Sequence, residues 1–246
     1  MRQFAVERPE PVAAGARGLG RLEPVLRRLA AQQGQWPPAV PTQVARVAAD
    51  PARTSGMGTE QAVEAGAAAA DRLVDAGADL VVVAGGGDGT PALVLLAALL
   101  DRDPVAVTGT TGAPGWAALV TAVRDGLRAA RPHVHDPAAV LAATGAVEVA
   151  ELTGLLLQCA VRRTGVLLSG APDVWAAAVV AQRVSFPVGS WLVAGCSPGS
   201  AVVTAAVAEL QLSPLLDLEL DDPAAVELAL GVLVGAVGLA RGAAGA

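Results

Sequence analysis

The clearest candidate for ligand chemistry in this chain is a glycine-rich turn formed by Gly85, Gly86, Gly87, Asp88, Gly89 and Thr90, hereafter the glycine loop. A backbone without Cβ atoms lets N–H groups approach an anion closely, and the N-terminus of a following helix adds a favourable field. The loop follows an apolar, β-branched run over 78–84 and precedes an apolar helical segment over 91–100. This strand, turn and helix order predicts a site for phosphate or another anion; a merely tight connection is the alternative.

Two further turns of small residues are candidates for the same site. They contain Gly109, Thr110, Thr111 and Gly112 in one case, and Ser169 and Gly170 in the other. The first follows a predicted strand over 104–107, and the second follows a predicted strand over 165–168. Because the carboxyl ends of parallel strands meet at one edge of a sheet, we expect these turns to lie near the glycine loop.

The elements that must position these turns indicate an α/β fold. Hydrophobic residues make up 53% of the 246 residues and aromatic residues only 2%, which suits Ala, Val and Leu helices packed on a buried parallel sheet. We predict helices over 15–34, 59–76, 91–100, 117–130, 137–163 with an interruption near 144–145, 173–183, 201–210 and from 224 onwards. We predict strands over 78–84, 104–107, 165–168, 191–194 and 215–218, with a short one near 44–49.

Composition excludes several classes of function. All 17 basic residues are Arg, so no lysine can form a Schiff base, act as a general base or grip phosphate in a Walker loop. The net charge of −6 disfavours nucleic acid as a partner. Cys159 and Cys196 lie in apolar surroundings and are expected in the core, so we predict neither a metal site nor a cofactor.

No membrane association or export is expected. The segment over 224–240 is apolar but carries Glu227 and follows an acidic run, which favours a buried helix over a membrane span. The first residues carry charges and a proline where a signal peptide needs an uninterrupted apolar stretch. The predicted location is the cytoplasm.

The segment from Gly86 to Thr90 resembles the Gly-Gly-Asp-Gly-Thr motif of the NAD kinase and diacylglycerol kinase superfamily. That resemblance implies a small-molecule kinase in which Asp88 helps to organise nucleotide and metal. Nothing downstream resembles the rest of those enzymes.

A second resemblance extends over most of the chain. The opening segment from Gly15 to Glu23 is similar to the amino-terminal signature of the nicotinate-nucleotide:dimethylbenzimidazole phosphoribosyltransferases, the CobT family of cobalamin lower-ligand assembly. Further segments resemble that family in the same order: 59–79 ahead of its phosphate loop, Asp136-Pro137, Gly145 with Glu148, 166–170, and 214–218. The glycine loop stands in the place of the family's phosphate loop.

The resemblance implies a Rossmann-like parallel sheet with helices on both faces, a small helical subdomain from the terminal regions, and a homodimer. We accordingly expect an N-terminal helical segment and connector over 1–58. A nucleotide-binding core over 59–246 follows, with the C-terminal helix packing back on the small subdomain. The implied ligands are a nicotinate mononucleotide-like phosphoribosyl compound and an aromatic base, and Glu148 matches a family glutamate.

The departures from the family concern the catalytic residues. A block of the family that precedes the phosphate loop is missing between Asp50 and Thr59, and the glycine loop has no Glu. The family's last loop carries the glutamate that deprotonates the incoming base; residues 218–223 occupy that place with no glutamate in register. Asp222 or Asp221 could replace it, since an azole that attacks ribose must lose a proton. The favoured interpretation is that both form a solvated acidic cap before Pro223 and the last helix, where Asp is common.

Three functions therefore stay open. The chain is a phosphoribosyltransferase acting on an aromatic base, or a catalytically silent relative that binds a nucleotide or a partner, or a kinase built on the glycine loop. The order of the family segments favours the first two.

Overall fold

The computed structural model describes residues 4–13, 19–85, 89–109, 115–197, 199–220, 222 and 224–244. Its centre is a four-stranded parallel sheet in the order β1-β2-β3-β4. The strands are β1 (Val44–Ala48), β2 (Leu80–Ala84), β3 (Gly165–Ser169) and β4 (Leu192–Ala194). Short apolar runs without polar alternation become strands here because both faces of the sheet are covered.

One face of the sheet is covered by the helices that connect successive strands. These are α2 (Pro51–Thr54), α3 (Thr59–Asp75), α8 (Val147–Val161), α9 (Pro172–Val184) and η3 (Phe186–Trp191). Val81, Val83, Val166 and Leu168 point into this layer. The alternate residues Leu80, Val82, Leu167 and Val193 point to the opposite face. Because successive side chains of a strand point to opposite faces of the sheet, the sheet separates the core into two clusters.

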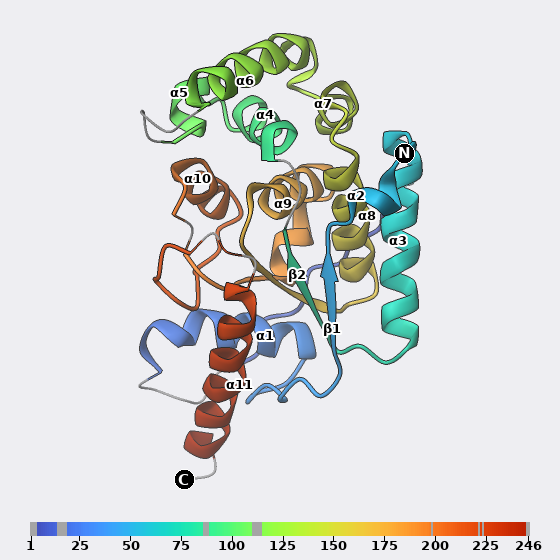
Figure 1. The fold of residues 1–246 in the computed structure, drawn as a ribbon. Coiled ribbons are helices and arrows are strands. Elements are labelled where there is room, and N and C mark those ends of the chain that lie inside the picture. Colours follow the sequence, from blue (N-terminus) through green and yellow to red (C-terminus); the bar gives the residue numbers. More distant parts are fainter. Residues whose placement is uncertain are drawn as a thin grey trace.

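The opposite face is covered by helices from the two ends of the chain. They are α1 (Glu23–Gln33), preceded by η1 (Gly20–Leu22), and α11 (Ala225–Ala244). Leu26 and Leu29 of α1 share one core cluster with Leu233 and Val237 of α11. The result is the three-layer, Rossmann-like α/β fold expected from the sequence, visible in Figure 1 with α1 and α11 on one side of the sheet and α3 on the other.

Among the described helices, α11 alone is long and apolar enough to cross a membrane, and 44% of its most apolar window is buried. The buried residues include Ala229, Leu233, Ala236 and Val237, which pack on the sheet. This packing agrees with the interpretation of the segment as a core helix.

A helical lobe is inserted between β2 and β3. It consists of α4 (Gly89–Leu99), α5 (Pro104–Val107), α6 (Trp116–Ala130), η2 (Arg131–His133) and α7 (Pro137–Thr144), and α10 (Ala201–Glu209) packs beside it. In Figure 1 the strand arrows point toward this lobe, so it lies beyond the carboxyl ends of the strands. The ends of β2 and β3, where two of the predicted turns begin, therefore face this lobe.

The predicted break in the segment 137–163 is confirmed. Asp136 begins α7 because its side chain accepts hydrogen bonds from the backbone N–H groups of Ala138 and Ala139. The helix ends at Gly145, whose φ of 61° favours glycine. The chain then begins α8 at Val147.

Two predicted strands are wrong. Residues 104–107 form the short helix α5, because Asp103 accepts a hydrogen bond from the Val105 N–H and Pro104 occupies the first helical position. Residues 215–218 make a single parallel bridge, between Leu216 and Cys196, rather than a strand. Glu219, with a φ of 49°, then turns the chain.

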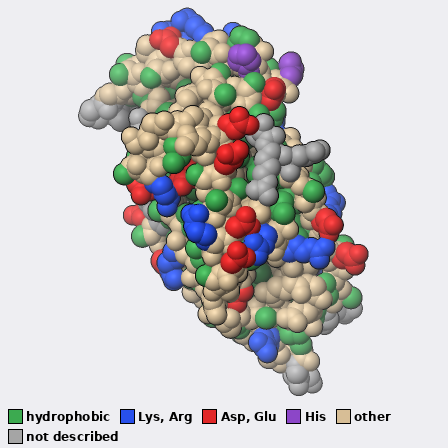
Figure 2. Space-filling view, turned by 90° about the vertical axis from the view of Figure 1, so that its right-hand side faces the viewer, with side chains coloured by type: hydrophobic (Ala, Val, Ile, Leu, Met, Phe, Trp, Pro, Cys, Tyr) green, Lys and Arg blue, Asp and Glu red, His purple; other side chains and the backbone are tan. Residues whose placement is uncertain are grey.

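The surface over α3 mixes charges of both signs, as the side view in Figure 2 shows. Arg162 at the end of α8 pairs with Asp71 at 2.8 Å and with Asp75 at 2.7 Å, both on α3. The hydrogen bonds that Arg162 donates to Asp75 and Asp71 raise the pKa of Arg162. The described residues of this face therefore form local ion pairs rather than a continuous basic surface.

Candidate ligand site at the carboxyl edge of the sheet

The carboxyl ends of β2 and β3 bring two of the predicted turns together. Ala84 is the register partner of Ser169, so Gly85 and Gly170 follow at neighbouring positions on the sheet edge. Gly170 has a φ of 91°, and the indole N–H of Trp175 donates to its carbonyl oxygen at 3.1 Å. The end of β4 lies alongside, where the Gly195 N–H donates to the Leu168 carbonyl at 2.8 Å. The structure thus confirms that these turns share an edge.

The glycine loop begins at Gly85 and leads into α4, whose first residues are Gly89 and Thr90. The N-terminus of an 11-residue helix therefore faces the same edge. Gly86, Gly87 and Asp88 lie outside the described residues. The described ends of the loop are consistent with the strand, turn and helix order expected from the sequence.

A carboxylate that the sequence did not single out lies against the glycine loop. Asp173, in the first turn of α9, is 2% exposed. A Cβ atom on Gly85 would lie 2.1 Å from Asp173 Oδ1 and 2.8 Å from the Ala171 side chain. Only glycine fits here, because the backbone at the start of the loop passes directly over this carboxylate. The pattern that could have indicated it is an Asp just inside a helix after a strand and a Gly turn.

The second predicted turn does not follow a strand. Gly109 comes after helix α5 and has a φ of 76°. Thr110, Thr111 and Gly112 lie outside the described residues. The turn was expected at the edge of the sheet because a strand was predicted before it. Since residues 104–107 form helix α5 instead, that expectation no longer follows.

Of the glutamates near the start of α8, the buried one is Glu151 rather than Glu148. Glu148 is half-buried in the first turn of the helix. Glu151 is 3% exposed and pairs through Oε1 with Arg53 Nε at 2.7 Å. Arg53 also donates to the carbonyl of Ala48, the last residue of β1, at 3.1 Å. The ion pair therefore joins the ends of β1 and α2 to the beginning of α8 at the carboxyl edge.

The loop over 218–222 is fastened to the same edge. The Glu219 N–H donates to Ser197 Oγ at 2.9 Å, and the Leu220 N–H donates to the Ser197 carbonyl at 3.0 Å. Asp222 is exposed, and its Oδ1 accepts a hydrogen bond from the Ala224 N–H at 2.7 Å, just before α11. Asp221 lies outside the described residues. The carboxylate of Asp222 thus has the geometry of a helix cap.

Within the described residues, no group of three or more His, Cys, Asp or Glu side chains is arranged to hold a metal ion. The described residues of this edge offer backbone N–H groups, a helix N-terminus and a few carboxylates. Such groups can hold an oxyanion and accept a proton.

The described residues define a Rossmann-like α/β protein, and comparison with known proteins identifies its family. A family model described as "Phosphoribosyltransferase" matches residues 50–244. The chain belongs to this family of phosphoribosyltransferases, within its nicotinate-nucleotide:dimethylbenzimidazole (CobT) group.

Two curated relatives carry the name nicotinate-nucleotide–dimethylbenzimidazole phosphoribosyltransferase. The protein of Streptomyces avermitilis is 41% identical over 190 residues, which cover 74% of this chain and 50% of the relative. The protein of Mycobacterium tuberculosis is 43% identical over 189 residues, which cover 73% of this chain and 51% of the relative. The chain spans about half the length of the curated relatives that it matches.

A solved structure of the enzyme of the same name from Thermus thermophilus superposes with a TM-score of 0.79 at 24% identity. The match covers 94% of this chain and 92% of the solved chain. It shows a common fold.

Proposed function

We propose that the carboxyl edge of the sheet binds the phosphate of a phosphoribosyl nucleotide of the nicotinate mononucleotide type. The observation that carries this proposal is the position of Gly85, next to Gly170 and packed on Asp173, at the entry to a helix N-terminus. The close packing of Gly85 leads the chain from the end of β2 to the start of α4, where a helix N-terminus offers N–H donors to an oxyanion.

We further propose that the bound nucleotide transfers its phosphoribosyl group to an aromatic base, as the names of the relatives describe for those proteins. In that step a ring nitrogen of the base forms a bond to the ribose anomeric carbon while the bond from that carbon to nicotinate breaks. The base loses the proton of its other nitrogen, and a carboxylate must accept it. Glu148 and the loop of Asp221 and Asp222 are the candidates that the sequence names.

The second candidate function is nucleotide binding without transfer. One observation favours it: the Asp222 carboxylate already accepts the Ala224 N–H at 2.7 Å, and the loop carries no glutamate in register with the family's. In this case the chain is a binding or regulatory subunit. Family membership supports either of these functions above the kinase.

The test combines binding with turnover. Purified protein is titrated with nicotinate mononucleotide by calorimetry, and nicotinate release is followed with dimethylbenzimidazole and a panel of other aromatic bases. Binding with release supports transfer, and binding without release supports the silent relative. If no nucleotide binds, the phosphate site is refuted. Titration with ATP and magnesium tests the kinase in the same assay.

A Gly85→Ala variant locates the site. Its Cβ would overlap the Asp173 carboxylate, so we expect the loop to shift and nucleotide affinity to fall by about tenfold or more. Gly231→Ala is the matched control, because nothing lies within 4 Å of a Cβ there on the exposed face of α11. Equal affinity in both variants would place the nucleotide elsewhere.

The expected homodimer and cytoplasmic location remain proposals. Light scattering of the purified protein tests the first, and fractionation of cells that express the chain tests the second.

A further inference from the structure

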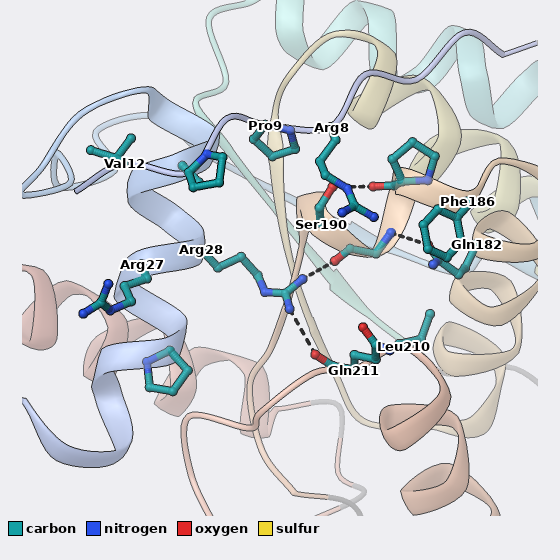
Figure 3. A pocket seen from close by; sticks show the side chains of 15 residues that line it. Arg8, Pro9, Val12, Arg27, Arg28, Gln182, Phe186, Ser190, Leu210 and Gln211 are labelled. Carbon is teal, nitrogen blue, oxygen red and sulfur yellow. Dashed lines mark hydrogen bonds between the residues drawn. The ribbon is translucent and has the colours of Figure 1, made fainter. Parts of the chain in front are cut away.

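A cavity of about 370 Å³ lies away from the glycine loop, at the amino end of β4. Its walls are α1, η3 and the residues after α10, and the N-terminal segment around Arg8 passes over it. Figure 3 shows Arg8 above the hollow, Arg28 crossing it from α1, and Phe186 at its side. The volume is within the range of small-molecule sites.

The lining of this cavity is basic although the chain is acidic. It includes Arg8, Arg27 and Arg28, and no Asp or Glu among the residues that form its wall in the described part of the chain. Arg27 is ion-paired with Glu23 at 2.6 Å, and in Figure 3 its guanidinium points away from Arg28. Two guanidinium groups, those of Arg8 and Arg28, therefore give the hollow its charge.

Arg28 is a half-buried cation held by neutral groups. Its Nη1 donates to the Gly189 carbonyl, and its Nη2 donates to the Gln211 carbonyl at 3.0 Å. No carboxylate of the described residues lies within ion-pair distance of it. Burial lowers the pKa of Arg28, as expected for a charge that has lost water without gaining a counter-ion. A charge in this situation is stabilised by an anion that enters the cavity.

Arg8 stands on the other side of the hollow, over an aromatic ring. Its guanidinium carbon lies 5.4 Å from the centre of the Phe186 ring. Phe186 is 68% exposed, although a large apolar side chain is usually buried. Pro9, Val12 and Leu210 add apolar wall. The cavity thus combines two cations with an accessible aromatic face.

We propose that this cavity binds a small aromatic anion, with its carboxylate or phosphate group between Arg8 and Arg28 and its ring against Phe186. The site is separate from the nucleotide site proposed above and does not depend on it. Guanidinium groups bind both kinds of oxyanion through paired N–H donors, and an aromatic ring adds stacking.

The probes are benzoate, phenyl phosphate and inorganic phosphate, each titrated into the full chain by calorimetry. The proposal predicts that benzoate or phenyl phosphate binds more tightly than inorganic phosphate. The one of these two aromatic probes that binds more tightly shows whether the cavity prefers a carboxylate or a phosphate. Absence of binding by both aromatic probes at millimolar concentration would overturn it.

Arg8→Gln is the decisive variant, because Arg8 is exposed and its loss does not threaten the fold. We expect it to weaken aromatic anion binding by about tenfold, the usual value of one charge-assisted hydrogen bond. Phe186→Leu should weaken the aromatic probes while leaving the affinity for inorganic phosphate unchanged. Arg72→Gln, which removes the same charge from the exposed surface of α3, is the matched control.

Two results would contradict the proposal even if a probe binds. One is an equal affinity of Arg8→Gln and Arg72→Gln for the aromatic probes, which would mean that the probes respond only to the net charge of the protein. The other is loss of benzoate binding in Gly85→Ala, which would place the probe at the glycine loop. Arg28→Gln is a supporting variant, expected to lower both affinity and thermal stability because Arg28 also binds two carbonyls.

Discussion

At the scale of single residues, the carboxyl edge is organised by two buried carboxylates, Glu151 and Asp173. Burial of a charged group is costly unless it is paired and hydrogen-bonded. Glu151 meets this condition through Arg53, and Asp173 lies where the backbone of Gly85 passes closest. Glu151 thus links α8 to the end of β1 through Arg53, and Asp173 restricts the start of the glycine loop to glycine.

Removal of the Arg53 side chain tests the value of the first of these pairs. Arg53→Met leaves Glu151 buried without its partner, so we expect a loss of about 1–3 kcal/mol in the free energy of unfolding. Arg21→Met serves as the control, because its pairing with Asp217 is solvent-exposed and such pairs contribute little. Urea denaturation of both variants measures the difference; equal midpoints would show that the buried pair contributes nothing.

Cys159 gives a prediction about reactivity. Burial, followed by the charge of Asp71, raises the pKa of its thiol to about 12. A raised pKa means that the folded protein keeps this thiol protonated. The contribution of the neutral thiol to folding stability is fully present below the pKa that Cys159 has in the unfolded chain, and it is lost as the pH rises from there through the pKa of the folded state. At pH 8 iodoacetamide should leave Cys159 unmodified in the native protein and alkylate it in denaturant, as peptide mass spectrometry would show. Rapid alkylation of the native protein would contradict its placement.

Sequence reasoning identified the glutamate-bearing helix but not which glutamate is buried. Helix α8 is buried from Val149 to Ala160, so its sequence lacks the polar face that would orient it. Glu148 was selected by its resemblance to a family position, whereas Glu151 is buried because α2 brings Arg53 to it. The periodicity of apolar residues in a helix cannot predict a contact between residues so far apart in the sequence.

At the scale of elements, α3 and α8 pack with their backbones in contact. A Cβ on Gly66 would lie 1.8 Å from the Glu151 carbonyl oxygen, and one on Gly154 would lie 1.9 Å from the Val63 carbonyl oxygen. The two glycines therefore determine how closely these helices approach. They also set the position of Glu151 relative to the sheet edge.

Gly66→Ala and Gly154→Ala should each destabilise the protein by about 1–3 kcal/mol or more, because the added methyl group has no space. In contrast, Gly235→Ala on α11 meets nothing within 4 Å and should stabilise its helix by up to about 1 kcal/mol. Thermal melting of the three variants provides the comparison. A neutral effect of Gly66→Ala would mean that the helices are farther apart than described.

Most elements could be predicted from apolar runs and from the Gly, Pro and Asp residues that mark their ends. The two errors, at 104–107 and 215–218, are short apolar segments in which period alone does not separate strand from helix or loop. At 104–107 the Asp103-Pro104 pair was the deciding helix-start signal. At 215–218 the outcome depends on pairing with the chain after β4, which no local pattern encodes.

At the scale of the whole molecule, the two ends of the chain close the second face of the sheet. Arg46 and Glu227 connect β1 of the sheet to α11, with Arg46 Nη2 donating to Glu227 Oε2 at 2.9 Å. The hydrogen bond from Arg46, and then its charge, lowers the pKa of Glu227. The pKa of Glu227 is therefore lower in the folded than in the unfolded chain. The pair stabilises the fold at pH values above the unfolded pKa, and this stabilisation is lost as the pH falls through the folded pKa.

Glu227→Gln should therefore lower the melting temperature slightly at neutral pH. The difference from the unmodified chain should shrink as the pH falls below the usual glutamate range of about 4 and through the lowered pKa of the folded carboxyl. It should also shrink in high salt, because the pair is exposed. Melting curves at several pH values test this expectation. A difference that persists at low pH would assign the effect to packing rather than to charge.

The position of α11 in the chain also bears on how the protein emerges from the ribosome. All four strands and every crossover helix are synthesised before residue 225, so the sheet can assemble while one of its faces still lacks α11. Until the last 20-residue helix arrives, Leu80, Val82 and Leu167 lack the apolar side chains of α11 that complete their core cluster. The nascent chain thus passes through a stage with an open apolar surface, a natural binding site for chaperones and a point at which truncated products aggregate.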